Sequence, residues 1–330
     1  MNQIHACITG VTGFLPSSVL DNATLSPMVG VDEEWIIART GIRQRHIMEG
    51  EEGSAHMAVH AVADLLQKTQ TRPEEVDLVI CTTVTPSYSF PSNAVVVCDS
   101  LHLNNAFAYD LAASCSGFLF GLETCNNMIL SGKYKKVVLV ASEKLSSMVN
   151  YKDAQTAPLF GDASAAVMVE PTTEALGVVD SILRVDGGGR HFLYRSAGGS
   201  KYPLTPESLE QGDQYIHQDG HAVFKRAVSE MSRVTLEMMD RHHLTADDID
   251  WYIPHQANIR IIDAIASRLS IPESKVLTNI AEVGNTSSCS IPLCMWQYEQ
   301  RLRKGDTLLL SSFGAGFTWG CMYIKWGYDA

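Results

Sequence analysis

Cys115 is the residue of this chain whose surroundings best suit a nucleophile. It lies between an apolar, strand-like stretch (residues 106–111) and an amphipathic helical pattern (residues 116–130). A thiol at the start of a helix is close to unpaired backbone N–H groups and to the positive end of the helix dipole, and both favour the reactive thiolate. A small buried cysteine that only fills space is the alternative. The pattern predicts nucleophilic chemistry if suitable partners lie nearby.

Two further polar side chains stand where a strand-like run or a glycine turn leads into a helix. His255 follows the apolar run 251–253, and Asn285 belongs to a Gly-Asn turn ahead of a helical pattern. A glycine-rich stretch, residues 312–317, ends another strand and suits close approach of the backbone to a ligand. Because strand ends in open α/β sheets meet at one crevice, we expect Cys115, His255 and Asn285 to converge there.

These residue types fit acyl transfer followed by decarboxylation. A thiolate attacks a thioester carbonyl to give an acyl-enzyme, and backbone N–H groups at Cys115 and in the loop 314–316 suit the resulting oxyanion. If a second substrate then loses CO₂, an imidazole and an asparagine amide stabilise the enolate oxygen as neutral donors. The alternatives are His255 as a capping or core histidine, and Asn285 as a turn with Thr286 as an N-cap.

Composition narrows the class of protein. The 330 residues suffice for two domains or one duplicated domain, and a net charge of −12 argues against a general nucleic-acid surface. The eight cysteines show no C-x-x-C pair and no zinc-ligand spacing, which predicts reduced thiols. Residues 1–5 do not resemble a signal peptide, and apolar runs such as 137–141 are far shorter than the ~20 residues of a membrane helix. We expect a cytoplasmic protein that does not enter the membrane.

Short apolar runs alternate with helical patterns, which predicts an α/β layered architecture that positions these side chains. The predicted strands span residues 4–9, 76–82, 106–111, 137–142, 165–170, 177–184, 249–253, 307–312 and 320–325. The predicted helices span residues 54–70, 93–101, 116–131, 222–242, 258–269 and 286–303. A weak internal repeat (helix, short turn, strand, Phe-Gly, strand) predicts two similar halves, residues 1–172 and 173–330, that share one continuous core.

Several motifs resemble those of the β-ketoacyl-acyl carrier protein synthase III (ketosynthase III) family of the thiolase superfamily. They are residues 35–45, 90–92, 110–118, 160–162, 255–258, 284–288 with 291–293, and 312–320, and together they extend over essentially the whole chain. The resemblance implies the thiolase fold, in which two similar βαβαβ-type halves form five α-β-α-β-α layers, and a homodimer. It also implies an acyltransferase: an acyl primer moves to a cysteine and then undergoes decarboxylative Claisen condensation with malonyl-acyl carrier protein. The product would be a β-ketoacyl-acyl carrier protein of fatty acid or specialised-metabolite biosynthesis.

The same resemblance implies roles for individual residues. Cys115 would be the acylated nucleophile, and His255 with Asn285 the decarboxylation pair. The backbone N–H groups of Cys115 and Gly316 would form the oxyanion hole. Phe313 would shield the site.

The resemblance also implies contacts with the substrates. Phe90 would reach across the dimer to the partner's acyl pocket. Other residues implied to bind substrate are Trp35, Arg39, His221, Phe224 and Phe313. The acidic acyl carrier protein would dock on Lys225, Arg260 and Arg268.

The residues near Trp35 have a physical interpretation of their own. Arg39, Arg43 and Arg45 form a local cluster of cations in an acidic protein, and Trp35 offers a flat face for a base. This combination fits the phosphates and adenine of coenzyme A, whereas a solvated basic loop is the alternative.

Four positions depart from the family pattern. Ala154 stands where an arginine is common eight residues before Asp162, and Val31 replaces a common threonine. The usual Gly-Asp-Gly-Ala-Gly reads Gly-Asp-Ala-Ser-Ala at residues 161–165, and His221 replaces a common asparagine. Because Ala154 and Val31 remove contacts at the nucleotide end of the coenzyme A site, we expect the condensation chemistry to be retained with an altered thioester donor. The donor would carry an acyl carrier protein-bound primer or an unusual acyl group, and the choice between acyl-CoA and acyl-acyl carrier protein stays open.

Other functions stay open on the sequence alone. A ketosynthase-III-like acyltransferase would move the acyl group from Cys115 to an alcohol or amine without decarboxylation. A cysteine hydrolase would use the same three side chains, and a non-catalytic subunit would use none. His56 and His60 lie four residues apart but lack a third ligand, and the glycines at 187–189 lack a dinucleotide-binding context. We therefore expect no metal and no cofactor beyond the thioester substrates.

Overall fold

Two mixed β-sheets form the framework of the protein. The computed structural model describes residues 3–330. The five-stranded sheet has the order β1-β7-β6-β4-β5, with the strands β1 (His5–Phe14), β4 (Leu78–Thr82), β5 (Phe107–Leu111), β6 (Val137–Glu143) and β7 (Ala163–Thr172). The four-stranded sheet has the order β11-β12-β13-β8, with the strands β8 (Gly177–Val185), β11 (Trp251–Pro254), β12 (Thr307–Gly314) and β13 (Thr318–Lys325). In the first sheet β4 pairs in parallel with β5 and β6, and in the second β11 pairs in parallel with β12.

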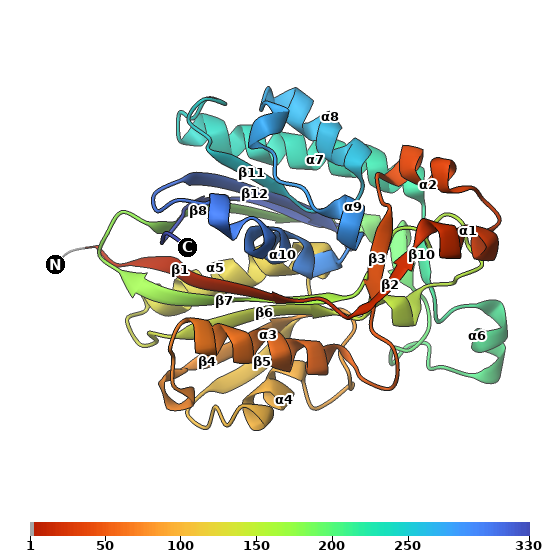
Figure 1. Ribbon diagram of the computed structural model, residues 1–330, viewed down its shortest axis with the longest axis horizontal. Helices are drawn as coiled ribbons and strands as arrows, with labels where there is room; N and C mark the ends of the chain where they lie inside the picture. Colours follow the sequence, from red (N-terminus) through yellow and green to blue (C-terminus); the bar gives the residue numbers. More distant parts are fainter. Residues whose placement is uncertain (1–2) are drawn as a thin grey trace.

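The helices complete a five-layered arrangement (Figure 1). Helices α5 (Gly117–Leu130) and α10 (Ser290–Gln297) lie between the two sheets, and their side chains join one hydrophobic cluster with both. Helices α3 (Ser54–Lys68) and α4 (Asn93–Ser100) cover the outer face of the first sheet. Helices α7 (Gly220–Arg241) and α8 (Ile259–Leu269) cover the outer face of the second. The order α-β-α-β-α agrees with the expected layers.

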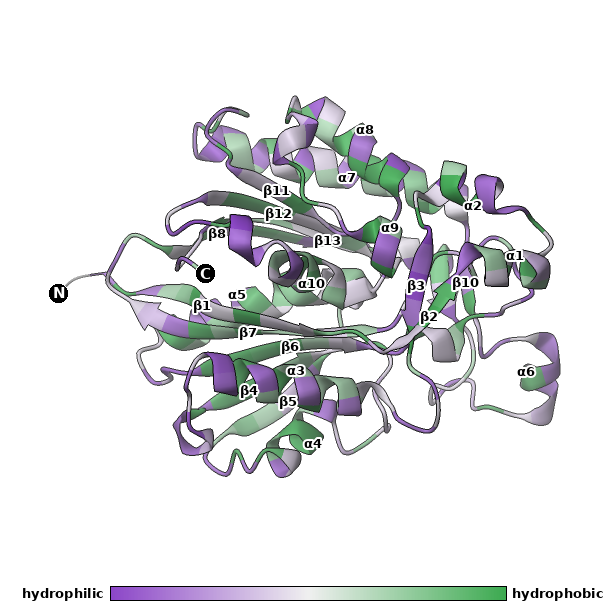
Figure 2. Cartoon of the chain, viewed as in Figure 1, coloured by the Kyte–Doolittle hydropathy of each residue, from purple (hydrophilic) through white to green (hydrophobic). Residues whose placement is uncertain are grey.

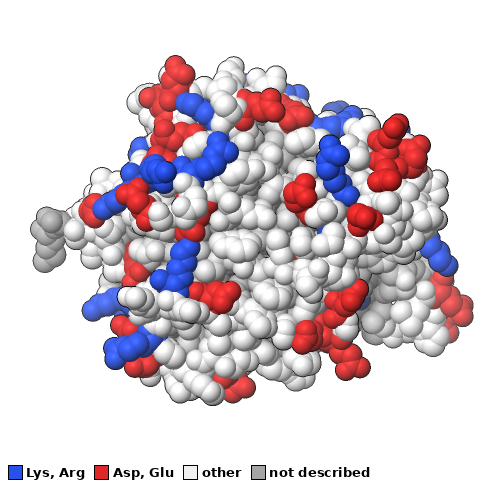
Figure 3. Space-filling view, in the orientation of Figure 1, with Lys and Arg blue, Asp and Glu red and all other residues white. Residues whose placement is uncertain are grey.

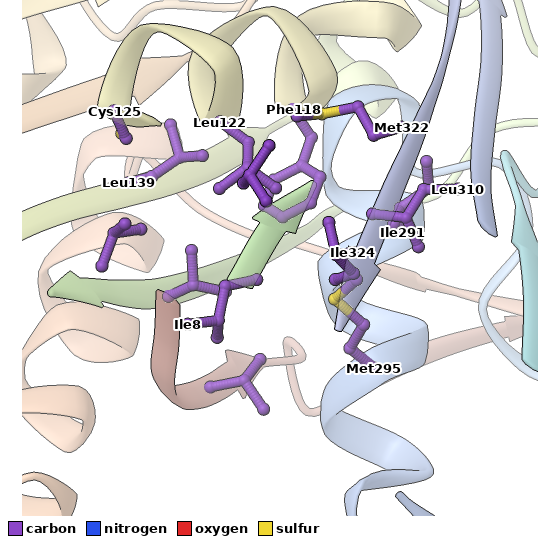
Figure 4. Close-up of a cluster of buried hydrophobic side chains, with 14 of the residues drawn as sticks. Ile8, Phe118, Leu122, Cys125, Leu139, Ile291, Met295, Leu310, Met322 and Ile324 are labelled. Carbon is purple, nitrogen blue, oxygen red and sulfur yellow. The ribbon is translucent and has the colours of Figure 1, made fainter. Parts of the chain in front are cut away.

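The middle layer is apolar because both of its faces meet a sheet. In Figure 4 the side chains of Phe118 and Leu122 on α5 point toward those of β6 and β13, while Ile291 and Met295 on α10 lie beside β12 and β13. Figure 2 shows the same contrast, since the central elements are mostly green and the outer helices have purple faces. A helix that is buried on both sides must be apolar nearly all round, which is why these two segments lack a charged stripe.

Glycines permit close packing of the first sheet. A Cβ on Gly121 of α5 would lie 2.5 Å from Leu139 Cδ1 of β6, and one on Gly13 of β1 would lie 2.3 Å from Trp296 Cε3. Gly13 also lies in the part of β1 that the predicted strand 4–9 did not include. The strand continues to Phe14 past a register shift between Ile8 and Gly10.

The other predicted strands and helices are present, with one clear error in length. The predicted helix 286–303 is wrong: α10 has eight residues and is flanked by the 3₁₀ turns η6 (Ser287–Cys289) and η7 (Glu299–Arg301). Short elements that the sequence did not predict gather at one end of the molecule, on the right in Figure 1. They are β2 (Ser18–Asp21), α1 (Asn22–Val29), α2 (Glu33–Thr40), β3 (Gln44–Ile47), β9 (Leu193–Arg195), α6 (Pro206–Gln211), β10 (Ile216–Gln218) and α9 (Ile280–Val283).

The strands of the first sheet all precede residue 173, and those of the second all follow residue 176. One hydrophobic cluster contains side chains from both sheets, in agreement with the predicted continuous core. The division of the chain at residues 172 and 173 stays a prediction. None of the helices in residues 3–330 is both long and apolar enough to span a bilayer. All eight cysteines are free thiols.

Candidate active site

A cavity of about 770 Å³ opens where elements of both halves meet. Cys115, His255 and Asn285 all line it, although they lie up to 170 positions apart in the sequence. The structure therefore brings together the three side chains that the sequence singled out. Leu145, Met148, Leu159, Phe160, Ile216 and Phe313 form much of its apolar wall.

Cys115 lies in the 3₁₀ turn η2 (Ser114–Ser116), between the end of β5 and the start of α5. The strand β12 packs directly on its backbone. Ser312 Oγ donates a hydrogen bond to the Cys115 carbonyl at 2.7 Å, and a Cβ on Gly314 would lie 2.8 Å from the Cys115 nitrogen. Burial raises the pKa of the Cys115 thiol to about 12, which opposes the expected preference for thiolate. At neutral pH the sulfur therefore rests as a thiol.

His255 is a buried, neutral imidazole. It follows β11 directly, and its backbone N–H donates to the Ser311 carbonyl of β12 at 2.8 Å. Its Nδ1 lies 2.6 Å from Ser290 Oγ at the start of α10. Burial lowers the pKa of His255 to about 3, so the ring carries no charge at neutral pH.

Asn285 is fixed through its backbone and its amide oxygen. Its N–H donates to the Leu159 carbonyl at 2.8 Å, and its carbonyl accepts from the Gly161 N–H at 3.0 Å. The Ser287 N–H donates to Asn285 Oδ1 at 2.9 Å. The preceding Gly284 has φ +68°, a conformation that favours glycine. With Oδ1 engaged, the amide presents its NH₂ group as the available hydrogen-bonding end.

The predicted oxyanion donors lie at two adjoining turns. Within residues 3–330, no turn or loop hydrogen bond to another residue's backbone is donated by the N–H of Cys115 or of Gly316, although the Cys115 N–H faces its own thiol. Ala315 lines the cavity, whereas Gly316 itself is not part of the lining. Phe313 does line it and packs against Phe317, with ring centroids 4.7 Å apart.

Two arginine–aromatic pairs line the cavity. The guanidinium of Arg39 lies 4.2 Å from the centre of the Trp35 ring, and that of Arg260 lies 5.4 Å from the Phe224 ring. Both are within the range of cation–π attraction. His221 also lines the cavity, so with Phe313 six of the residues expected to contact substrate or carrier are found there.

The expectation for Arg45 is wrong. Its side chain is fully buried and donates to Leu20 O, Asn22 Oδ1 and Pro158 O, each at 2.9 Å. It therefore holds three segments of chain together and is unavailable to an external anion. Arg43 is exposed and lies outside the cavity lining.

The remaining predicted residues lie outside the cavity. Lys225 and Arg268 are exposed on α7 and α8. Phe90 is 87% exposed and does not line the cavity of its own chain. Of the two departures from the family pattern, Val31 also packs outside the cavity, whereas Ala154 is an exception and lines it.

Several residues of the site escaped the sequence analysis. Tyr194, Arg195 and Gln218 line the cavity from the two-stranded antiparallel sheet formed by β9 and β10. Three-residue strands give no usable periodicity, so no sequence signal placed them there. Ser287 and Ser290 were visible only as neighbours of Asn285.

Glu143 is a further buried group beside the site. Its carboxyl accepts from Thr85 Oγ1 at 2.7 Å, from the Val84 N–H at 3.1 Å and from Ser288 Oγ at 2.9 Å. Burial raises the pKa of this carboxyl and outweighs the hydrogen bonds that lower it. Glu143 is the last residue of β6, and the sequence alone did not predict its hydrogen-bond partners.

No group of three potential metal ligands occurs among the described residues 3–330. The face of the molecule in Figure 3 carries acidic and basic side chains interspersed, without a continuous basic stripe.

Comparisons with known proteins agree with this geometry. A family model described as 3-oxoacyl-acyl-carrier-protein synthase III matches residues 109–187, and the model of its C-terminal part matches residues 239–326. The chain is 52% identical to β-ketoacyl-acyl-carrier-protein synthase III 2 of Bacteroides thetaiotaomicron, over all of this chain and 98% of that protein. It is 43% identical to β-ketoacyl-acyl-carrier-protein synthase III of Porphyromonas gingivalis, over all of this chain and 98% of that protein.

Solved structures confirm the thiolase-like α/β fold. The 3-oxoacyl-acyl-carrier-protein synthase III of Aquifex aeolicus superposes with a TM-score of 0.89 at 35% identity, over 97% of this chain and 100% of that chain. The enzyme of the same description from Pseudomonas aeruginosa gives a TM-score of 0.90 at 34% identity, over 99% of each chain. This chain belongs to the β-ketoacyl-acyl-carrier-protein synthase III family, the acyltransferases that carry out a condensation step of fatty acid biosynthesis.

Proposed function

We propose that Cys115 accepts an acyl primer from a coenzyme A thioester and that His255 and Asn285 then promote its condensation with malonyl-acyl carrier protein. The observation that supports this assignment is the single cavity lined by a thiol, a neutral imidazole and an amide with its oxygen engaged. A hydrolase would need a base to activate water. A histidine whose pKa is about 3 is a poor base at neutral pH, whereas it remains a good neutral donor.

The first half-reaction is a thioester exchange. The sulfur of Cys115 forms a bond to the acyl carbon, the bond from that carbon to the carrier sulfur breaks, and the thiol proton ends on the departing carrier thiol. Because burial opposes the free thiolate, attack and proton loss are best coupled within the bound complex. The N–H groups of Cys115 and Gly316 are suited to the tetrahedral oxyanion.

The second half-reaction needs stabilisation of an enolate. When the malonyl group loses CO₂, the electrons of the broken carbon–carbon bond pass to the thioester oxygen as an enolate. We assign the stabilising donors to the His255 imidazole, with Ser290 donating to its Nδ1 so that Nε2 keeps the proton, and to the Asn285 amide. The carbanion then attacks the acyl carbon, the bond from that carbon to the Cys115 sulfur breaks, and the departing thiolate takes a proton from water.

The edge of the first sheet supports the proposal of a homodimer. Strand β5 pairs only with β4 within the described chain, so its other edge is free. Phe107 on this strand is 41% exposed, and Phe90 nearby in the chain is far more so. A free edge strand beside exposed aromatic side chains is a surface that proteins normally cover. We propose that a second copy covers it and that Phe90 contacts the partner.

The partners follow from the same family. Lys225, Arg260 and Arg268 are exposed cations on neighbouring helices, and we propose that they dock the acidic acyl carrier protein. The carrier arm would then enter the cavity beside Arg39 and Trp35, which would contact its phosphates. We propose that the protein carries out this reaction in the cytoplasm.

The test separates the two half-reactions. His255→Ala and Asn285→Ala are incubated first with acetyl-CoA, with acylation of Cys115 followed by intact mass, and then with malonyl-acyl carrier protein labelled in the carbon lost as CO₂. We expect loading of Cys115 to persist and CO₂ release to fall about 10²-fold or more, as for loss of one oxyanion donor.

Asn105→Ala, an exposed asparagine outside the cavity, is the matched control. Free acid in place of ketoacyl product would favour a hydrolase. Loading from acyl-acyl carrier protein but not from acyl-CoA would overturn the proposed donor.

A further inference from the structure

The cavity is cationic, in a protein that carries an excess of acidic residues. The chain has 37 acidic and 25 basic side chains, yet Arg39, Arg195 and Arg260 line the cavity and no aspartate or glutamate does so among residues 3–330. Such a lining favours an anionic ligand. Two of these arginines lie over aromatic rings, as described above, and the third has no role yet.

Arg195 has no acidic partner in the described chain. It ends β9 and pairs with Ile216 of β10. Its Nη1 lies 3.6 Å from Met148 Sδ, and a thioether is a weak acceptor. Its Nη2 passes close to Gly198, where a Cβ would come within 3.1 Å of it. Arg195 is an exposed residue of the cavity lining, and most of its guanidinium donors have no protein partner within residues 3–330.

The contact with Met148 places Arg195 at a particular part of that wall. Met148 belongs to a hydrophobic cluster against which Trp35 and Ala154 also pack, and all three side chains line the cavity. Ala154 supplies no charge to this wall. Arg195 and Ala154 thus line the same cavity from different elements, and Arg195 contacts Met148, a member of the cluster against which Ala154 packs.

We propose that Arg195 is a specificity-determining residue that binds a phosphate of the acyl donor's carrier at this wall. The proposal rests on the proposed use of a carrier-bound thioester. A guanidinium presents a planar pair of N–H donors that match two phosphate oxygens, which a lysine or an alanine does not. The phosphate belongs either to the nucleotide of coenzyme A or to the phosphopantetheine arm shared with acyl carrier protein.

The experiment compares donors that lose phosphates one at a time. Wild type and Arg195→Gln are loaded with acetyl-CoA, its 3′-dephospho form, acetyl-phosphopantetheine, acetyl-pantetheine and acetyl-acyl carrier protein, and acylation of Cys115 is followed by intact mass. We expect Arg195→Gln to raise the KM for acetyl-CoA about 10-fold, with kcat changed less than about 3-fold, as for loss of a charge-assisted hydrogen bond. The penalty should vanish for the first donor that lacks the recognised phosphate, and always for acetyl-pantetheine. A penalty for acetyl-acyl carrier protein as well would identify the phosphate of the arm.

Two further variants make the result specific. Arg190→Gln removes the same charge from an exposed arginine of η4 (Gly187–His191) that lies outside the cavity, and it should leave every KM unchanged. Ala154→Arg, introduced into Arg195→Gln, should restore much of the affinity for acetyl-CoA by returning a cation to the same wall.

An unchanged KM for acetyl-CoA in a folded Arg195→Gln would overturn the proposal, as would an equal penalty on acetyl-pantetheine. Failure of the wild type to load from any donor would instead refute the proposed function.

Discussion

Gly314 offers a sharp test of how the nucleophile is positioned, because replacing it by alanine adds a single carbon against the backbone of Cys115. The added Cβ would lie 2.8 Å from the Cys115 nitrogen, 3.2 Å from the Ser116 nitrogen and 3.3 Å from Cys115 Cα. Ordinary non-bonded contacts begin at about 3.5 Å, so β12 and the turn η2 must separate by several tenths of an ångström. All three atoms belong to the backbone, and no side chain can move aside to relieve the overlap.

The expected effect is on the rate of acylation. Misplacement by about 1 Å costs around 10²-fold in rate, and loss of one oxyanion donor costs about 10²- to 10³-fold. For a smaller displacement of the Cys115 N–H, we expect Gly314→Ala to load Cys115 from acetyl-CoA about 10- to 100-fold more slowly, with little change in KM. Rapid-quench samples analysed by intact mass give the rate.

Gly187→Ala is the matched control, because a Cβ there meets nothing within 4 Å. It should load at the rate of the wild type. Thermal unfolding of both variants shows whether the fold is intact. A folded Gly314→Ala that loads as fast as Gly187→Ala would refute the assigned role of the β12–η2 contact.

Three further predictions concern stability and assembly. The pKa of His255 is about 3 in the folded protein and near its ordinary 6.5 in the unfolded one, so between these pH values only the unfolded state binds the extra proton. As the pH falls below 6.5, the free energy of unfolding of wild type should therefore fall by up to about 1.4 kcal/mol per pH unit relative to that of His255→Gln. The same pH dependence of the free energy of unfolding in both proteins, measured by urea denaturation, would refute this. Arg45→Met leaves Asn22 Oδ1 and the Pro158 carbonyl without their donor, so we expect urea denaturation to show a loss of about 3 kcal/mol, and an unchanged midpoint would contradict the role of Arg45. Phe107→Asp places a charge on the free edge of β5 and should convert the proposed dimer to a monomer in light scattering, whereas an unchanged mass would show that this edge is not the interface.

The layered fold and the meeting of three side chains could be predicted from local patterns. The apolar run of β6 and the alternation of strands with helices are patterns that depend only on residues close together in the sequence. The positions of Cys115 and His255 just after strands were enough to bring both to the cavity. The resemblance to known condensing enzymes supplied the family, which the comparisons confirm.

The parts that could not be predicted depend on segments distant in the sequence. Arg45 resembles a basic loop residue until Leu20, Asn22 and Pro158 are seen to surround it. The preference of Cys115 for the thiol state depends on burial of its side chain in the folded protein, which no pattern near residue 115 reveals. Arg195 lines the cavity from a two-stranded sheet of three-residue strands that residues 196–215 separate in the sequence.

Glu143 also affects how the protein unfolds. Its carboxyl is held by Val84 and Thr85, which follow a strand of the first sheet, and by Ser288, which precedes the helix α10 of the second half. Separating the two sheets would leave the Glu143 carboxyl and its hydrogen-bond donors buried without partners, at a cost of about 1–3 kcal/mol for each unpaired group. Opening one half while the other stays folded is therefore costly. The protein should unfold in one cooperative step, and the cavity that holds Cys115, His255 and Asn285 should keep its shape until the whole chain unfolds.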